Sequence, residues 1–233
     1  MSNEFACIIP LSKDYDKFMG GNKTFSGFEK VSGKTLLERI VEKVGSLPEV
    51  SRVDLFTNID RPFDLNVTTC KWSIKSRPPS INHENVCVEE IIESYIQSVE
   101  GDKFLYVSPR YQLLRRASIQ ACIDIIKSNR SQSVATSINN QCLSWYQEKP
   151  LNFSLAEKTP PVAELEKVMM EAGGCYSFTR EHFERHKKRV SMETVFVEIF
   201  KWESLEILNP NDRNVVELLL DAGLDELNER FTN

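Results

Sequence analysis

A polar loop directly after the first apolar run of the chain carries groups that can bind phosphate. The apolar run, Phe5–Pro10, ends at a proline as a buried first strand would, and residues 11–33 after it are rich in glycine and lysine. Lysine ammonium groups and the backbone N–H groups of glycine-rich loops both neutralise phosphate oxygens. A solvated surface loop would have a similar composition, and the placement after the strand favours phosphate binding. The available groups are Ser12, Lys13, Gly20, Gly21 and Lys23.

Arginines in two later stretches could contact a nucleotide or an anionic ligand. Arg77 precedes two prolines, which hold the backbone rigid, and a rigid arginine beside strand ends suits recognition of a base or ribose. Arg110, together with Arg115 and Arg116, would suit a carboxylate or a phosphate. Structural roles are also open. Arg77 could pair with Glu84, and Arg115 and Arg116 could open a solvated helix.

Three other signals are weaker as evidence of a site. Asp14–Asp16 spells D-x-D, but in metal-dependent glycosyltransferases that motif follows a later strand. His182 and His186 have the i, i+4 spacing of metal ligands on a helix, yet they lie among arginines and lysines, which favours a solvated basic helix. The six cysteines are far apart and mostly lie in apolar stretches, which indicates small hydrophobic residues rather than zinc ligands or disulfides.

The elements that would position these residues alternate along the chain. Short β-like runs separated by longer amphipathic segments predict a mostly parallel sheet flanked by helices, an α/β fold in a single domain over residues 1–233. Residues 139–167 are irregular and too long for a mere connector, so we expect them to build part of a site or to cover the sheet. The expected strands are 5–10, 53–57, 103–108, 133–138, 175–178 and 194–199, and the expected helices are 34–46, 88–99, 117–127 and 211–220.

Length and charge exclude several classes of protein. The 233 residues, 41% of them hydrophobic, are enough to bury one large core without disulfide or metal staples. A net charge of −5 argues against a nucleic-acid partner, because phosphate backbones require clustered lysine and arginine. No apolar run approaches the length of a membrane span, and no signal peptide is readable at the start. We therefore expect a cytoplasmic protein.

Four stretches, in this order, resemble the CMP-sugar cytidylyltransferases, the family that includes the sialic-acid-activating synthetases. The first is Phe5–Pro10 with its polar loop and the helix start Gly33–Leu37, which is similar to the family's G-K-P-L. The second, Arg77–Cys87, looks like R-P-x-E-L-A-x-D-x-A-S without a gap. The third, Leu105–Arg115, is similar to L-Q-P-T-S-P-L-R, and the fourth, Glu171–Arg180, to E-N-G-A-I-Y-I-T-R. Together they extend over most of the chain.

The resemblance implies a Rossmann-like nucleotidyltransferase fold. It also implies transfer of CMP from CTP to an acidic sugar or a related acceptor, with release of pyrophosphate and with Mg²⁺ as cofactor. Such chemistry is mostly electrostatic, because cations must stabilise charge on the phosphates and the leaving group. By this likeness Lys13 and Lys23 are expected to be the catalytic cations on the triphosphate, and Ser12, Gly20 and Gly21 to bind the nucleotide beside them.

The same likeness assigns the remaining site residues. Arg77 and Cys87 are expected on the cytidine side. Ser108 and Arg110, which stand where the family has Gln and Thr, are expected to contact the acceptor. Asp212 is the remaining candidate for the metal. Family members often form homodimers through a long insertion after the strand that carries Y-I-T-R. That region is short here, so the resemblance leaves open whether this chain is a monomer or a homodimer.

Two departures from the family pattern leave other functions open. Residues 11–16 replace the family's Arg-Gly-Gly core, and Leu208 and Asn209 stand where the family has metal-binding aspartates. A non-catalytic nucleotide-binding member of the same fold would fit these changes. A glycosyltransferase using a nucleotide-sugar would need a D-x-D after the strand 103–108, which this sequence lacks.

Overall fold

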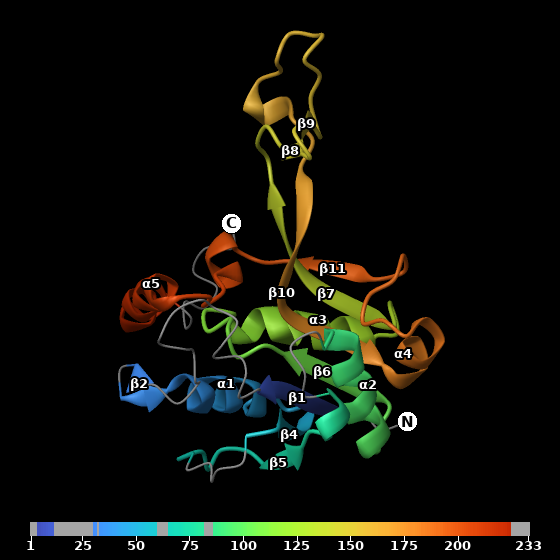
Figure 1. Ribbon diagram of the computed structural model, residues 1–233, viewed down its shortest axis with the longest axis vertical. Coiled ribbons are helices and arrows are strands. Elements are labelled where there is room, and N and C mark those ends of the chain that lie inside the picture. Colours follow the sequence, from blue (N-terminus) through green and yellow to red (C-terminus); the bar gives the residue numbers. More distant parts are fainter. Residues whose placement is uncertain (1–3, 12–29, 32, 60–64, 82–85, 225–233) are drawn as a thin grey trace.

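The computed structural model describes residues 4–11, 30–31, 33–59, 65–81 and 86–224, and its centre is a seven-stranded mixed sheet (Figure 1). The strand order is β11-β7-β10-β6-β1-β4-β5. β10 runs antiparallel to β6 and β7, whereas every other adjacent pair is parallel, so the expected mostly parallel α/β sheet is confirmed. The strands are β1 (Phe5–Leu11), β4 (Val50–Thr57), β5 (Trp72–Ser76), β6 (Lys103–Val107), β7 (Ser133–Asn140), β10 (Val168–Thr179) and β11 (Val195–Glu198).

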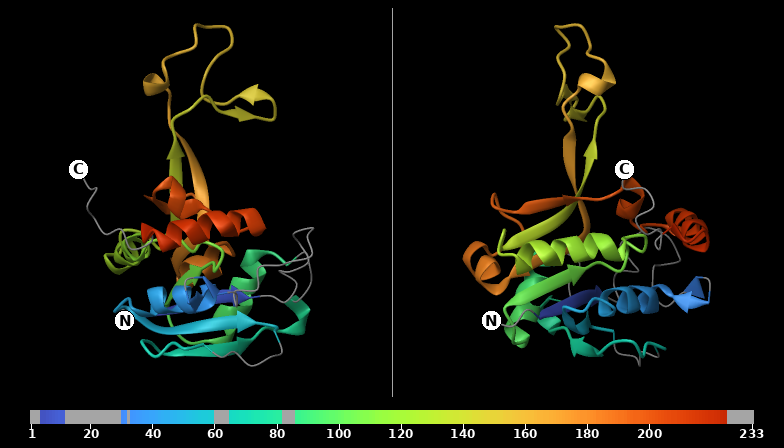
Figure 2. Two further views of the ribbon diagram at one scale, coloured as in Figure 1. Left: turned by 90° about the vertical axis from the view of Figure 1, so that its left-hand side faces the viewer. Right: turned by 180° about the vertical axis from the view of Figure 1, so that it is seen from behind.

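Helices cover both faces of this sheet, as the views in Figures 1 and 2 show. α1 and α3 pack on one face and enclose the larger apolar cluster, while α2 and α4 pack on the other face around a second cluster. α5 packs beside the start of α1, against a third cluster that includes Leu36 and Leu113. Among the described residues, no helix is long and apolar enough to cross a membrane. The helices are α1 (Leu36–Gly45), α2 (Val88–Ser98), α3 (Arg116–Lys127), α4 (Arg180–His186) and α5 (Pro210–Asp221).

Local sequence explains where the expected elements begin and end. β1 and β6 are continuous apolar runs and are buried along their whole length, as central parallel strands must be. α1 begins at a capping box, in which the Thr35 hydroxyl accepts a hydrogen bond from the Glu38 N–H (3.1 Å) and the Glu38 carboxylate accepts one from the Thr35 N–H (2.7 Å). Every strand and helix expected from the sequence is present, with small differences at the ends except in β10, which begins at Val168, well before the expected 175–178.

One strand of the central sheet, β5, was not expected from the sequence, and the helix expected in the basic stretch is present as α4 with surroundings that differ in part from the expectation. β5 is an edge strand with mostly exposed or half-buried residues, so it shows no apolar run. The short helix α4 lies in the basic stretch that was expected to be solvated, and that expectation is wrong for one face. His182 is buried against the core, where burial lowers the pKa of its imidazole, and its ring lies 4.7 Å from that of His186.

Residues 139–170 form a projecting arm, shown at the top of Figure 1, that extends beyond the body of the fold. The arm contains the last residues of β7, a small hairpin of β8 (Trp145–Tyr146) and β9 (Lys149–Pro150), the 3-10 turn Val162–Glu164 and the first residues of β10. The expectation that this stretch covers the sheet is therefore wrong. It leaves the sheet because β7 and β10 continue as a paired two-stranded ribbon past the last neighbouring strand.

Candidate functional site

Four parallel strands define one functional edge of the sheet. β1, β4, β5 and β6 end there at Leu11, Thr57, Ser76 and Val107. In open α/β sheets, ligands bind outside the carboxyl ends of the strands. Most of the residues predicted for the site lie in the loops that follow these strand ends. The predicted phosphate-binding residues lie outside the described part of the chain: Ser12, Lys13, Gly20, Gly21 and Lys23.

Arg77 lies at this edge, directly after β5. Its backbone N–H donates to the Thr57 carbonyl of β4 (2.8 Å), and its guanidinium Nη2 donates to the Ile81 carbonyl (3.0 Å). The side chain therefore closes the 3-10 turn Pro79–Ile81 that follows β5, and Arg77 is 4% exposed. Cys87, predicted beside it, is exposed at the start of α2, where its N–H donates to Glu90 Oε2 (2.8 Å). The predicted alternative partner of Arg77, Glu84, lies outside the described residues.

Ser108 begins the loop after β6 and is buried. Its N–H donates to the Gly174 carbonyl of β10 (3.0 Å), and its own carbonyl accepts from the Tyr111 N–H (3.3 Å). Its hydroxyl oxygen accepts a long hydrogen bond from the Arg110 N–H (3.4 Å). These contacts fold residues 108–111 into a tight turn against β10. Ser108 therefore contributes to the site mainly through its backbone, which shapes this turn.

Arg110 faces a carboxylate that the sequence analysis did not identify. Arg110 Nη1 donates to Glu206 Oε1 (2.8 Å), and the Tyr111 hydroxyl donates to the other oxygen, Glu206 Oε2 (3.1 Å). The backbone adds a third link, because the Ile207 N–H donates to the Arg110 carbonyl (3.1 Å). Burial and the neighbouring Glu206 carboxylate raise the pKa of the Tyr111 phenol, which therefore stays protonated and donates. Arg110 is thus a paired cation at the predicted acceptor loop.

Two glycines allow Tyr111 to lie where it does. Residues 172–175 form a bulge in β10, because the pairing with β7 shifts register between Glu171 and Tyr176. A Cβ at Gly173, whose φ is +70°, would lie 2.6 Å from the Tyr111 hydroxyl, and a Cβ at Gly174 would lie 3.0 Å from the Tyr111 ring. The aromatic ring therefore packs directly on this bare backbone, and any side chain there would displace it.

Arg115 lies at the start of α3, but its side chain binds a buried carboxylate and is not solvated as one alternative had predicted. Its backbone N–H and its Nε both donate to Glu203, at 2.9 Å and 3.1 Å. Its guanidinium also lies 4.5 Å from the centre of the Phe200 ring. Glu203 is completely buried and accepts a further bond from Ser118 Oγ (2.6 Å). Arg115 therefore stabilises the packing of α3, and its side chain is not placed to bind an acceptor.

Asp212, the predicted metal ligand, caps α5. Its Oδ2 accepts hydrogen bonds from the backbone N–H of Leu208 (3.0 Å) and of Asn209 (3.1 Å), and from the Asn209 side-chain amide (2.7 Å). Asn209 Oδ1 in turn accepts from the N–H groups of Asn211 and Asp212. Over the described ranges, no three His, Cys, Asp or Glu side chains are grouped as metal ligands would be. The described residues alone therefore do not form a magnesium site.

The structure thus brings together the loop after β6, the β10 bulge and the segment before α5. Ser108 and Arg110 were predicted there, whereas Tyr111 and Glu206 were missed. The glycine pair within the fourth resemblance stretch was one usable signal, because adjacent glycines mark a close approach of another group. Glu206 gave no local signal, since it lies 96 residues from Arg110 along the chain.

No protein-family model and no curated protein sequence matches this chain. Solved structures do match it over nearly its whole length, and they share the Rossmann-like nucleotidyltransferase fold. One is a CMP:2-keto-3-deoxy-manno-octonic acid synthetase complexed with CTP, with 12% identity and a TM-score of 0.64, covering 94% of this chain and 99% of its own.

Two further matches are a diphosphocytidyl-methylerythritol synthase and a cytidylyltransferase. The 4-diphosphocytidyl-2C-methyl-D-erythritol synthase from Anaerococcus prevotii has 11% identity and a TM-score of 0.61. The 2-C-methyl-D-erythritol 4-phosphate cytidylyltransferase from Thermus thermophilus has 12% identity and a TM-score of 0.57. Each covers 94% of this chain and 99% of its own. At these identities the likeness establishes the fold, and the fold expected from the resemblance is confirmed.

Proposed function

We propose that this protein is a cytidylyltransferase that transfers CMP from CTP to an anionic small-molecule acceptor. An acceptor oxygen would form a bond to the α-phosphorus of CTP, the bond to the β-phosphate oxygen would break, and pyrophosphate would leave. The observation that carries the proposal is the fold, which extends over 94% of the chain and is shared with a synthetase solved with CTP. The residues at the carboxyl edge of its sheet add support, because Arg77 and Arg110 lie in loops at that edge.

The proposed roles follow the position of each loop. Lys13 and Lys23, with Ser12, Gly20 and Gly21, would bind the triphosphate from the loop after β1. Arg77 and the neighbouring Cys87 would lie on the cytidine side, with Arg77 holding the turn between β5 and α2 in place. Mg²⁺ is proposed to enter bound to the triphosphate, whose oxygens can supply most of its ligands.

An acidic sugar or a related acceptor is proposed for the loop after β6. Arg110 supplies a positive group there, and Ser108 holds the turn that presents it. Acceptors named for the structural neighbours are also anionic, a keto-octonic acid in one case and an erythritol phosphate in another. A carboxylate or phosphate on the acceptor would meet the exposed edge of the Arg110–Glu206 pair.

A nucleotide screen followed by an activity assay tests this function. CTP at about 100 times its dissociation constant should stabilise the protein by about 2.7 kcal/mol, more than ATP, GTP or UTP does. Pyrophosphate release should then require CTP together with an anionic acceptor. Equal stabilisation by all four nucleotides would remove the cytidine assignment. Lys23→Ala should weaken CTP binding far more than CMP binding, because CMP lacks the β- and γ-phosphates.

One observation favours a second candidate function. The Asp212 carboxylate is engaged in capping α5, and the described ranges contain no group of three metal-ligating side chains. A non-catalytic nucleotide-binding protein with the same fold would have this arrangement. Selective stabilisation by CTP without pyrophosphate release from any acceptor would establish that alternative.

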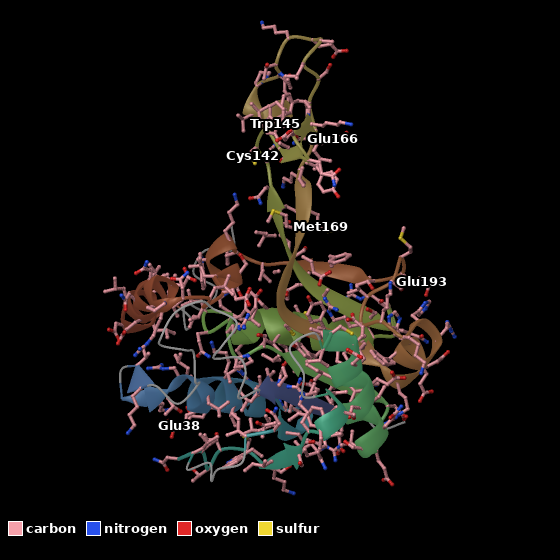
Figure 3. The ribbon with its side chains drawn as sticks, in the orientation of Figure 1. Glu38, Cys142, Trp145, Glu166, Met169 and Glu193 are labelled. Carbon is pink, nitrogen blue, oxygen red and sulfur yellow. The ribbon has the colours of Figure 1, made fainter. Side chains whose placement is uncertain are left out.

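We also propose that two copies associate through the arm. A two-stranded ribbon alone is marginally stable in water, and this one exposes many large apolar side chains. Figure 3 labels Cys142, Trp145, Glu166 and Met169 along it. Glu–Lys dipeptides recur at 148–149, 157–158 and 166–167, so an antiparallel copy could offer opposite charges. The exposed apolar residues of the arm are Leu143, Trp145, Tyr146, Leu151, Leu155, Val162, Met169 and Met170.

Sedimentation of matched variants tests the association. The wild type should sediment as a dimer, and a variant with Trp145→Ser and Tyr146→Ser should sediment as a monomer. Leu218→Ser is the control, because Leu218 is a large apolar residue at least as exposed as Trp145 and Tyr146 but lies on α5. A monomeric wild type, or loss of the dimer in the Leu218 variant alone, would contradict this assignment.

A further inference from the structure

We propose that Glu206 is a positioning residue for the acceptor, an inference that rests on the cytidylyltransferase function proposed above. By binding Arg110 and Tyr111 with its two carboxylate oxygens, Glu206 fixes the loop after β6 at the place where the acceptor must meet the nucleotide. Glu206 itself does not contact the reacting atoms. It acts through the two side chains that it holds.

The contacts of Glu206 join three separate segments at the carboxyl edge of the sheet. One is the loop 108–111, which supplies both donors to the carboxylate. The second is the β10 bulge, on which the Tyr111 ring rests without room for a side chain at Gly173 or Gly174. The third is the segment before α5, whose Ile207 N–H binds the Arg110 carbonyl. A shift of any one segment would therefore move the other two.

Buried residues on both sides of Glu206 fix its backbone, so its carboxylate has a defined position. The 3-10 turn Lys201–Ser204 immediately before it is fixed by the buried Glu203, which binds the N–H groups of Arg115 and Phe200. Ile207, directly after it, is buried in the cluster beneath α5. The backbone on both sides of Glu206 is thus fixed, so its carboxylate can hold the loop at little cost in conformational entropy.

The pair also remains accessible to a small molecule. The side chain of Glu206 is 28% exposed and that of Arg110 16%. Arg110 uses Nη1 on Glu206, so the carboxylate sets the direction of the guanidinium plane. The negative charge of Glu206 also offsets part of the Arg110 charge, which acts in the opposite direction on an anionic acceptor, and we expect the loss of orientation to dominate when Glu206 is removed. Both effects act on the acceptor side of the site rather than on the triphosphate side.

The test compares the KM for the acceptor with the KM for CTP. Pyrophosphate release is measured with CTP and either 2-keto-3-deoxy-manno-octonic acid or 2-C-methyl-D-erythritol 4-phosphate. Glu206→Ala should raise the acceptor KM about tenfold while the KM for CTP stays within about twofold. Glu206→Gln, which keeps one oxygen to accept from Arg110 and can donate its amide N–H to the Tyr111 hydroxyl oxygen, should recover most of this loss. Tyr111→Phe, which removes one of the two contacts, should give an intermediate increase.

The controls separate positioning from folding and from the proposed function. Glu181→Gln removes an exposed i, i+4 pair with Arg185 on α4, at the opposite edge of the sheet, and should change neither KM. An unchanged acceptor KM in Glu206→Ala, or an equal rise in the KM for CTP, would overturn the positioning role while wild-type activity stands. If Glu206→Ala does not fold, Tyr111→Phe decides by the same criterion. A wild type that releases pyrophosphate with neither acceptor overturns the proposed function, and this inference with it.

Discussion

Two arginine–glutamate pairs join the same two segments of this molecule, and they differ mainly in burial. Arg115–Glu203 and Arg110–Glu206 both connect the region after β6 with the region before α5. Glu203 is completely buried and accepts bonds from two backbone N–H groups, the Arg115 Nε and Ser118 Oγ. Glu206 is partly exposed and accepts from two side chains at the carboxyl edge of the sheet.

The difference separates a residue of the fold from a residue of the site. A buried carboxylate is stable only while all its donors are present, so it locks the chain in one arrangement. A partly exposed carboxylate is stabilised by water when a donor is lost, so its removal costs the fold less. The same chemistry therefore stabilises the core at residue 203, whereas at residue 206 it holds a loop that a ligand can reach.

The largest expected effect comes from removing the buried carboxylate. Glu203→Ala should lower the free energy of unfolding by about 3–5 kcal/mol, because it leaves the Arg115 guanidinium and Ser118 without their partner in the core. For a chain of this length that is a fall of about 10 °C in the melting temperature. Glu206→Ala should cost about 1 kcal/mol. Chemical denaturation of both variants measures the two free energies of unfolding. Equal losses would contradict the view that the buried pair stabilises the fold more than the accessible pair does.

The next effect disturbs the accessible pair through its packing. Gly174→Ala places a methyl group 3.0 Å from the Tyr111 ring, so the ring must move away from the bulge. Such overpacking costs about 1–3 kcal/mol. The double variant Gly174→Ala with Tyr111→Ala should lose much less than the sum of the two single variants, because the ring that clashes is gone. Strict additivity would show that Tyr111 does not pack on this bulge.

Most of the fold could be predicted from the sequence, because its central strands are continuous apolar runs. β1 and β6 are buried along their whole length, and the helical spacing of the apolar residues in α1 is clear. β5 was missed because it is an edge strand, with Ile74 47% exposed. The true length of β10 was missed because the Gly173–Gly174 bulge interrupts its pattern, and because Met169 and Met170 face solvent on the arm.

The site was less predictable, because long-range pairing determines it. Arg110 was identified from its type and its place after a strand, but its partner lies 96 residues away. Arg115 looked like a solvated residue because Glu203, 88 residues away, is recognisable as buried only once the chain is folded. Charge in a sequence shows that a residue needs a partner or water. Only the fold decides which of the two it receives.

A third prediction tests whether the buried pair needs an arginine specifically. Arg115→Lys keeps the charge but loses the Nε hydrogen bond to Glu203 and the stacking on Phe200, so we expect a loss of about 1–2 kcal/mol. Arg110→Lys should cost about 0.5 kcal/mol, because that pair is partly exposed. Denaturation curves of the two variants measure this contrast. A larger loss of unfolding free energy in Arg110→Lys than in Arg115→Lys would show that the Arg110–Glu206 pair, and not the buried Arg115–Glu203 pair, contributes more to folding.

The smallest expected effect on stability concerns Asp212, a third acidic residue of the same region, which is partly buried. Its Oδ2 accepts two backbone N–H bonds at the start of α5, where Asn209 is the N-cap and Asp212 is the N3 residue of the capping box, and an asparagine at this position keeps a side-chain oxygen that can accept them. Asp212→Asn should therefore change the free energy of unfolding by about 0.5 kcal/mol, chiefly through the lost charge near the helix N-terminus. Since its carboxylate is engaged in the cap, we also expect Mg²⁺-dependent pyrophosphate release to persist in this variant. The opposite result, loss of that release with metal-free CTP binding and folding intact, would make Asp212 a metal ligand, because a neutral amide cannot replace carboxylate charge beside a divalent ion. In either outcome the effect of Asp212→Asn on folding should stay well below that of Glu203→Ala, because Asp212 is only partly buried whereas Glu203 is completely buried.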